Sequence, residues 1–462
     1  MEIVHEGAGN PSGAAGIELQ PLMEPLERWI ERQYRHSAAA MLRSVSPLGI
    51  VKNRPGFAQS VRPRKGSIVA SPVLGAYDPE PDYFFHWFRD SAVVIDALRI
   101  LFEDNGIDGE FFTHFADFVR FSLALQDLDG RALGQSAWRD AIAPDFRQYV
   151  RPEADLAAAH GAALLGETRV NPDGTLDISK WPRPQYDGPA MRAIALLHWR
   201  GTVRLDNELA AQVDALLRAD LRFTLHHWRE ASFDIWEEEK GQHYYTLRAS
   251  ARALEGGADW FGQRGEQADA AACRAEANAI LSALDGFWRE DLQFYKSRIL
   301  ESNAPSTKEL DISVIFAAIH AGADSATHSV RDPRMHATLA RLEALFDAEY
   351  AINKNRGVAR GPAMGRYAGD VYYSGGAYYF STLAAAEFCF RAAARSPAMQ
   401  ELIDRGDAFL ETVRAYTPAS GELSEQFDQH TGVQRSAQQL AWSYAAFITC
   451  VHARRQVIPP GE

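Results

Sequence analysis

Two acidic segments that lie far apart in the chain carry the residue types that could perform acid–base chemistry. The segment FDIWEEEK, residues 233–240, places three consecutive glutamates directly behind a tryptophan. The segment GELSEQFD, residues 421–428, contains Glu425 between a serine and a glutamine. Hydrolysis of a glycosidic bond needs two carboxyl groups, one to protonate the leaving oxygen and one to act on the other side of the sugar. These two segments could each supply one, with Glu237 and Glu425 as the candidates.

Aromatic residues stand beside charged ones in four segments, and this mixture suits a sugar site. Ring faces meet the apolar C–H face of a pyranose, while carboxylates and guanidinium groups form forked hydrogen bonds to its hydroxyls. Each segment also has a simpler interpretation, because Asp90 and Asp187 are good helix N-caps and the glutamates could offset a helix macrodipole. The repetition of the mixture favours the sugar site. The four segments are YFFHWFRD (83–90), WPRPQYDGP (181–189), FDIWEEEK (233–240) and GRYAGDVYY (365–373).

The elements that must position these segments are helices. Apolar residues recur at helical spacing along most of the chain, whereas strand signals are scarce. The pattern predicts twelve helices near residues 22–45, 90–103, 110–127, 188–200, 204–228, 243–263, 268–289, 309–322, 333–349, 376–395, 399–415 and 436–455.

The links between these helices alternate in length. Links into the even-numbered helices are long and hold the aromatic and charged segments, whereas links out of them are short. Six helical hairpins that carry all of the long aromatic and charged loops on one side predict a closed ring of helix pairs. The inner helices of this ring begin where those loops end. We therefore expect one catalytic domain over residues 21–458, after a disordered segment over 1–20. The basic link 46–65 is expected to expose its charges to solvent.

Composition restricts the class of partner. The formal net charge of −13 argues against nucleic acid, because phosphate binding needs a basic surface. No apolar run reaches membrane-spanning length, and the N-terminus lacks the features of a signal peptide. Cys273, Cys389 and Cys450 lie in apolar stretches without metal-ligand spacing and are predicted to be buried, reduced thiols. These features favour a cytoplasmic enzyme, and no motif for a cofactor or a metal is found.

Five ordered segments together resemble glycoside hydrolase family 15, the glucoamylases. The resemblance is strongest over residues 66–91, 170–193, 234–254, 365–387 and 421–446. It implies an all-α fold, the (α/α)6 barrel, with a pocket at one end. It also implies a monomeric, inverting, exo-acting α-glucosidase. Such an enzyme hydrolyses α-1,4-linked glucose from the non-reducing ends of maltooligosaccharides or starch-like glucans and releases β-glucose.

The family's functional residues carry over onto matching positions of this sequence. Glu237 matches the general acid, and Glu425 matches the general base that activates water. Arg89 and Asp90 match the pair that holds the terminal glucose, whereas Glu238 matches a contact to the leaving sugar. Tyr83 and Trp87 match the aromatic neighbours of that glucose, and Trp181, Arg183 and Asp187 match a loop that lines the same pocket. Trp236 flanks the general acid, Arg366 and Asp370 match a polar pair near it, and Trp442 follows the general base in its family position. Glu239 is expected to be a solvated charge at a helix start.

Departures from the family pattern leave the preferred linkage and chain length open. Phe88, the pair Ala368-Gly369 and Tyr379 replace residues that are usual in the family. The same mechanism could therefore act on α-1,6-linked oligosaccharides, as in isomaltose or dextran, or on trehalose. A non-catalytic sugar-sensing protein is a further alternative, because regulatory subunits of phosphorylase kinase resemble this family. The presence of both carboxylates argues against that alternative.

Overall fold

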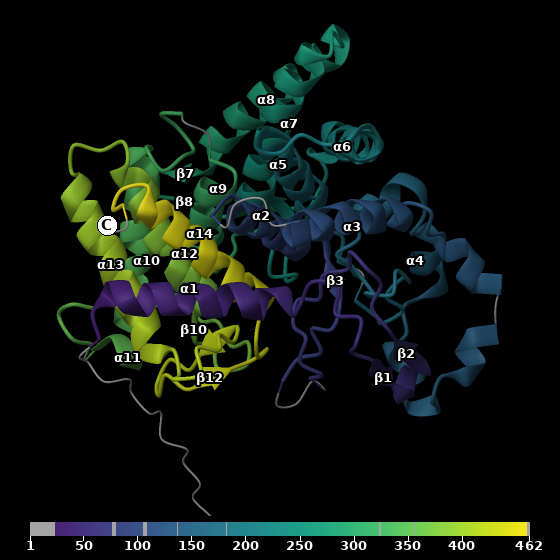
Figure 1. The fold of residues 1–462 in the computed structure, drawn as a ribbon, viewed down its shortest axis with the longest axis horizontal. Helices are drawn as coiled ribbons and strands as arrows, with labels where there is room; N and C mark the ends of the chain where they lie inside the picture. Colours follow the sequence, from purple (N-terminus) through teal and green to yellow (C-terminus); the bar gives the residue numbers. More distant parts are fainter. Residues whose placement is uncertain are drawn as a thin grey trace, which may run out of the picture.

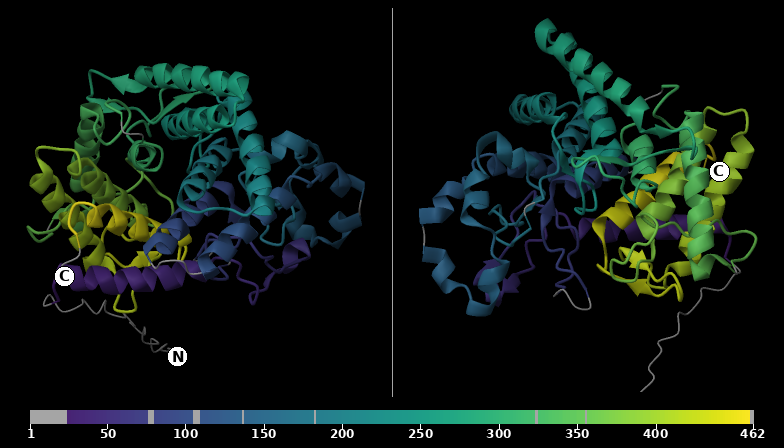
Figure 2. Two further views of the ribbon diagram at one scale, coloured as in Figure 1. Left: turned by 45° about the horizontal axis from the view of Figure 1, so that its top comes forward. Right: turned by 180° about the vertical axis from the view of Figure 1, so that it is seen from behind.

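The chain folds into a ring of helices (Figures 1 and 2). The computed structural model describes residues 24–75, 80–104, 109–135, 137–181, 183–322, 325–354 and 356–459, so the segment predicted to be disordered, 1–20, lies outside the described residues. The long helices are α1 (Leu26–Leu42), α2 (Phe88–Asp104), α3 (Gly109–Leu125), α5 (Asp187–Thr202), α6 (Asn207–His227), α7 (Tyr244–Gln263), α8 (Gln267–Leu284), α9 (Ser313–His320), α10 (Pro333–Glu349), α12 (Tyr379–Ala393), α13 (Met399–Tyr416) and α14 (Ala441–Arg455). Two short helices, α4 (Glu153–Ala158) and α11 (Ala351–Lys354), accompany them.

Each of the twelve predicted helices is present, with ends that differ by a few residues. The second, fourth, sixth, eighth, tenth and twelfth of the predicted helices are α2, α5, α7, α9, α12 and α14. These six inner helices contact one another in cyclic order, and the contact between α14 and α2 closes the ring. The outer helices pack against them, for example α1 on α14, α8 on α7 and α13 on α12. The prediction of an all-α (α/α)6 barrel is thereby confirmed.

Burial separates the inner helices from the outer ones. Along α12, every residue from Tyr379 to Phe390 is buried, because this helix contacts neighbours on all sides. Along α1 only one stripe is buried, which includes Trp29, Ile30 and Tyr34, and the opposite face meets solvent. Among the described residues, no helix is both long and apolar enough to cross a membrane. The three cysteines are buried and free, as predicted.

Small antiparallel sheets hold the loops that precede the inner helices. The strands are β1 (Lys52–Arg54), β2 (Gln59–Val61), β3 (His86–Trp87), β4 (Arg169–Val170), β5 (Ser232–Phe233), β6 (Lys240–His243), β7 (Trp288–Arg289), β8 (Phe294–Tyr295), β9 (Arg298–Leu300), β10 (Ala377–Tyr378), β11 (Gln426–Phe427) and β12 (Gln434–Arg435). β3, β6 and β10 lead directly into α2, α7 and α12, and each pairs with strands from other loops. These pairings fix the starting points of the inner helices relative to one another.

The prediction that the basic link 46–65 exposes its charges is wrong for two residues. Lys52 and Arg54 are both buried. Arg54 donates from Nε to Oδ2 of Asp82 at 2.7 Å and from Nη1 to Asn171 at 3.0 Å, and the Lys52 amine lies 3.6 Å from Asp82. The buried carboxylate of Asp82 needs these cations, because an unpaired buried charge is costly. Asp82 directly precedes the Tyr83–Asp90 segment, so the link braces a loop of the predicted sugar site.

Candidate active site

A pocket of about 280 Å³ lies where the loops before the inner helices converge. Twelve of the fourteen predicted site residues line it: Tyr83, Trp87, Arg89, Asp90, Trp181, Arg183, Trp236, Glu237, Glu238, Arg366, Glu425 and Trp442. Asp187 and Asp370 are not part of this lining, which differs from the prediction for Asp187. Each instead lies behind the pocket and holds an arginine in place, as described below.

Glu237, the predicted general acid, lies in a tight turn with an unfavourable backbone conformation. Its φ angle of 62° is in the left-handed region, which costs a residue other than glycine about 1–3 kcal/mol. The buried Asp234 stabilises the turn, since its carbonyl accepts from the Glu237 N–H at 2.9 Å. The Glu237 carboxylate accepts from the indole N–H of Trp87 at 2.7 Å and from that of Trp181, and Arg183 donates to the Glu237 carbonyl. The turn therefore aims this carboxyl group into the pocket between two indoles.

Glu425, the predicted general base, lies on another loop, directly before β11. Ser436 donates to its Oε2, and Tyr83 donates to its Oε1 at 3.2 Å. The Tyr83 hydroxyl is itself in hydrogen-bond contact with that of Tyr372, at 2.8 Å. Burial raises the pKa of Glu425 to about 7, although both hydrogen bonds act to lower it. A carboxyl group with a pKa near neutrality is a suitable general base, because much of it is ionised at neutral pH and the ionised form holds a proton well.

Arg89 and Asp90 lie at the start of α2, at the inner end of the pocket. Arg89 donates to Asp187 Oδ2 at 2.9 Å and to the Ile235 carbonyl at 3.0 Å, so two other loops fix its guanidinium. Asp90 Oδ2 lies 3.6 Å from Arg89 Nη2. Burial raises the pKa of Asp90 to about 6, and the nearby Glu237 and Asp187 also raise it, whereas Arg89 lowers it.

Neither aspartate is an N-cap, so the simpler interpretation of these two segments is wrong. Helix α2 begins at Phe88, which places Asp90 within the first turn, and α5 begins at Asp187 itself. In the described part of the chain, Asp90 Oδ2 and Asp187 Oδ1 are buried atoms without a hydrogen-bond partner. These two oxygens therefore make no capping hydrogen bond to a backbone N–H group.

A second cluster of charges surrounds Glu238 at another wall of the pocket. Asp370 grips Arg366 through two hydrogen bonds of 2.7 and 2.6 Å, and Arg366 Nη2 lies 3.2 Å from Glu238 Oε1. The Tyr367 hydroxyl donates to Glu238 at 2.7 Å. Lys308, from the loop before α9, places its amine 2.6 Å from Glu238 Oε2. Glu238 is thus a carboxylate shared among three donors at the edge of the pocket.

Glu239 is not the solvated charge that the sequence predicts. It accepts from Arg298 Nη1 at 2.8 Å and from the Ser306 hydroxyl at 2.8 Å. Arg298 also donates to Asp311, which accepts in addition from the indole N–H of Trp236 at 2.9 Å. Glu239 therefore ties the turn that carries Glu237 to the loop that carries Lys308, and only the folding of the ring brings these segments together.

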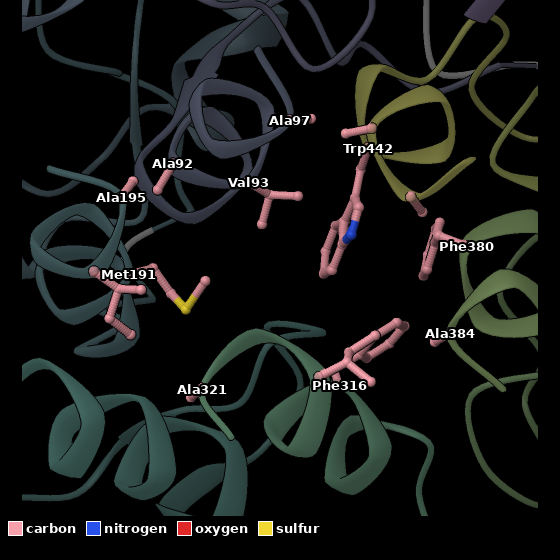
Figure 3. Close-up of a cluster of buried hydrophobic side chains, with 14 of the residues drawn as sticks. Ala92, Val93, Ala97, Met191, Ala195, Phe316, Ala321, Phe380, Ala384 and Trp442 are labelled. Atoms are coloured by element: carbon pink, nitrogen blue, oxygen red, sulfur yellow. The ribbon is translucent and has the colours of Figure 1, made fainter. Parts of the chain in front are cut away.

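Buried apolar side chains of the main core cluster lie at the inner end of the pocket (Figure 3). Trp442 of α14 stacks on Phe380 of α12 with ring centroids 4.8 Å apart, and Phe316 of α9 lies 5.4 Å from Trp442. Val93 of α2 and Met191 of α5 face these rings across the middle of the ring of helices. All five residues are buried, each with at most 5% of its surface exposed. We call these five residues the waist.

Sequence reasoning missed several residues of the site. Phe380, Tyr372, Arg169 and Leu440 line the pocket, and Lys308 contacts Glu238. Tyr372 lies within the GRYAGDVYY segment, whose mixture of aromatic and charged residues already indicated a sugar site. Phe380 lies in an Ala-rich helix, where a single phenylalanine gives no such indication. Lys308 lies in the long link before α9, the eighth predicted helix. This position alone could have identified it as a candidate site residue.

Comparisons with known proteins agree with this geometry. The model of the glycosyl hydrolases family 15 matches residues 137–404 and 395–452, which is more than half of the chain. The sequence is 27% identical over 475 residues to the probable glucoamylase of Schizosaccharomyces pombe, over 94% of this chain and 92% of that protein. It is 25% identical over 506 residues to the intracellular sporulation-specific glucoamylase of Saccharomyces cerevisiae, over 94% of this chain and 85% of that one.

Solved structures show the same likeness. The fold matches that of the family 15 glucoamylase from Hypocrea jecorina with a TM-score of 0.77 at 26% identity, covering 94% of this chain and 73% of that one. It also matches the glucoamylase of Hormoconis resinae with a TM-score of 0.74 at 27% identity, over 93% of this chain and 74% of that one. From its sequence, its ring of helices and its pocket, the chain belongs to glycosyl hydrolase family 15.

Proposed function

We propose that this protein is an inverting, exo-acting α-glucosidase that hydrolyses α-1,4-linked glucose from the non-reducing ends of maltooligosaccharides or starch-like glucans. The observation that carries the proposal is a set of buried polar atoms without partners at the inner end of the pocket. Within the described residues, Arg89 Nε, Asp90 Oδ2 and Trp442 Nε1 are such atoms. Leaving a buried polar group unpaired costs about 1–3 kcal/mol. The hydroxyls of a terminal glucose would supply both donors and acceptors to satisfy them.

The two carboxyl groups then have distinct roles in one displacement. Glu237 gives its proton to the glycosidic oxygen, and the bond from that oxygen to the anomeric carbon breaks. Glu425 takes a proton from a water molecule, whose oxygen bonds to the anomeric carbon from the opposite face. An α-linkage then yields β-glucose without a covalent intermediate. This route requires a separation of roughly 6.5–9.5 Å between the carboxyl groups, against about 5–5.5 Å for a retaining enzyme.

The buried apolar side chains at the inner end of the pocket support exo-action. We infer that the waist blocks the axis of the ring below Arg89, so that a glucan enters only by its end. The pocket volume of about 280 Å³ is close to the lower limit of roughly 300 Å³ for small-molecule sites, which suits one sugar unit beyond the scissile bond. Glu238, with Arg366 and Lys308 around it, lies where we place the leaving sugar.

We further propose a monomeric protein whose residues 21–458 form a single catalytic domain. One continuous hydrophobic core cluster draws residues from all six inner helices, which supports a single domain. The three free, buried cysteines and the likeness to an intracellular glucoamylase favour the cytoplasm.

The test is glucose release from maltose, maltotriose, isomaltose and trehalose, with the anomer followed by proton NMR. We expect the maltooligosaccharides to be the best substrates and β-glucose to appear first. Glu425→Gln should lower turnover by about 10²–10⁴-fold, as for loss of a general base. Glu422→Gln, in the same segment but outside the pocket lining, is the matched control and should remain active.

Other outcomes would redirect the proposal. A preference for isomaltose or trehalose would keep the mechanism and change the substrate. Initial release of α-glucose would refute inversion. Saturable sugar binding without any hydrolysis would instead indicate a sugar-sensing protein.

A further inference from the structure

The segment that leads into α2 carries hydrogen-bond donors for both proposed catalytic carboxyl groups. Tyr83 donates to Glu425, and the indole N–H of Trp87 donates to Glu237. The buried Phe85 stands between Tyr83 and Trp87 in the sequence. The three rings are in contact, since the centroid of Trp87 lies 5.3 Å from that of Tyr83 and 5.8 Å from that of Phe85. The position of this ring cluster therefore determines where both donors lie.

Arg169 packs on this ring cluster from the neighbouring strand. β3 and β4 are paired so that Trp87 and Arg169 stand directly opposite each other, and side chains at such positions interact across an antiparallel pair. The guanidinium carbon of Arg169 lies 4.8 Å from the centroid of the Trp87 ring and 4.0 Å from that of Phe85. Both distances are within the range of about 6 Å over which a cation is attracted to a ring face. Arg169 thus contacts the indole whose N–H meets Glu237.

The loop that follows β4 holds the Arg169 guanidinium in this position. Its Nε donates to Asp177 Oδ2 at 2.8 Å, and its Nη2 donates to the Ser179 hydroxyl at 3.3 Å. Asp177 is fixed in turn, because its Oδ1 accepts from the Ser179 N–H at 2.8 Å and from the Ser179 hydroxyl at 2.7 Å. The side chains of Arg169 and Asp177 are 11% and 9% exposed, so solvent screens this ion pair only weakly.

A second arginine contacts the same phenylalanine from outside the pocket lining. The guanidinium carbon of Arg54, in β1, lies 4.0 Å from the centroid of the Phe85 ring. Arg54 is paired with Asp82, and Arg169 is paired with a carboxylate of its own, so two cations contact one ring without an uncompensated charge. Phe85 is thereby held by two fixed guanidinium groups, and Trp87 packs against Phe85 and Arg169 together.

We propose that Arg169 is a positioning residue for the general acid. It fixes the indole of Trp87, and this indole fixes the carboxyl group of Glu237 through its N–H. The inference rests on the proposed function, in which Glu237 protonates the glycosidic oxygen. Without Arg169 the indole is free to shift and the carboxyl group loses a fixed donor, although every residue proposed to touch the sugar is still present. A misplacement of about 1 Å can lower the rate of a catalysed step by roughly 10²-fold.

The first experiment compares Arg169→Gln with the unaltered chain on maltose and on α-glucosyl fluoride. Fluoride leaves with much less help from a general acid than a sugar hydroxyl does, so a misplaced acid impairs the hydrolysis of maltose selectively. We expect kcat for maltose to fall roughly tenfold or more, kcat for the fluoride to fall less than about threefold, and KM to change little. Arg169→Lys keeps a cation beside Asp177 but loses the planar fork, and it should show a smaller change in the same direction.

Arg151→Gln is the matched control for these kinetics. The side chain of Arg151 is 6% exposed and lies 2.8 Å from Glu167, so the substitution also breaks a shielded ion pair, but Arg151 does not line the pocket. It should lower the melting temperature and leave the ratio of the two kcat values unchanged. A melting temperature measured for each variant separates loss of folding from loss of positioning.

The indole N–H of Trp87 gives a second readout that does not require hydrolysis. Its exchange with solvent, followed by heteronuclear NMR and assigned with Trp87→Phe, should be about tenfold faster in Arg169→Gln, because the indole opens more readily. The inference is overturned if this exchange is unchanged in folded Arg169→Gln, or if turnover of both substrates falls by the same factor. An unaltered chain that hydrolyses neither substrate would refute the proposed function instead, and the exchange of the indole proton would still decide whether Arg169 positions Trp87.

Discussion

Replacing Asp90 by asparagine should make the protein more stable and less active. The side chain of Asp90 is only 13% exposed, and its Oδ2 lies 3.6 Å from Arg89 Nη2. Among the described residues this oxygen has no hydrogen-bond partner. The carboxylate is thus held in an unfavourable environment at the inner end of the pocket. Asparagine keeps the shape of the side chain and removes the charge.

The expected gain in stability follows from the pKa of Asp90, which is raised from 3.8 to about 6 chiefly by burial. As pH rises from about 4 to about 6, the unfolded chain ionises at this residue before the folded chain does, so the free energy of unfolding falls. Above pH 6 the cost stays constant. At about 1.36 kcal/mol per pKa unit, this cost is about 3 kcal/mol at neutral pH. Asp90→Asn should recover up to that amount at pH 7 and almost nothing at pH 3.

The expected loss of activity follows from the hydroxyl that Asp90 is proposed to bind. A hydrogen bond to a charged group contributes about 1.5–3 kcal/mol. Its loss should lower kcat/KM for maltose by roughly ten- to hundredfold.

The assay pairs the melting temperature at pH 7 and pH 3 with kcat/KM for the same variant. Glu103→Gln, an exposed substitution at the other end of α2, is the control and should change neither quantity appreciably. The reasoning is refuted if Asp90→Asn retains full kcat/KM, or if its melting temperature at pH 7 drops.

Three further substitutions test other parts of the site. Ser436→Ala removes a hydrogen bond that lowers the pKa of Glu425, so that pKa should rise above its value of about 7. Because the base must be ionised, the acidic limb of kcat/KM against pH should move to higher pH, whereas Ser443→Ala, which removes a hydroxyl bonded to the Ser424 carbonyl, should leave it in place. Arg89→Lys cannot keep bonds to both Asp187 and the Ile235 carbonyl, so kcat/KM should fall at least tenfold, and an undiminished value would contradict the role of its planar fork. Lys308→Met removes the amine 2.6 Å from Glu238 and should raise KM for maltose several-fold with a smaller effect on kcat. Lys240→Met, which removes an exposed ion pair with Glu301, is the control, and equal KM values for the two variants would exclude Lys308 from the site.

The helices and the side of the ring that carries the site could be predicted from the sequence. Helical periodicity depends on neighbours three and four residues apart, so α2, α7 and α12 can be recognised from short segments. The alternation of long and short links predicts which helices are inner ones. The likeness of five ordered segments to a known family predicts Glu237 and Glu425. All of this information is local or is carried by the order of segments along the chain.

The partners of the charged side chains were decided only by the tertiary structure. Glu238 and Lys308 are 70 residues apart in the chain, and Arg89 and Asp187 are 98 apart. No local pattern predicts such pairs, because they form only when the ring closes and brings the loops to one end. For the same reason the sequence suggested capping roles for Asp90 and Asp187, and solvation for Glu239 and Arg54. A charged residue in a loop looks alike in sequence whether it meets water or a buried partner. Only the packing of the inner helices determines which of these it meets.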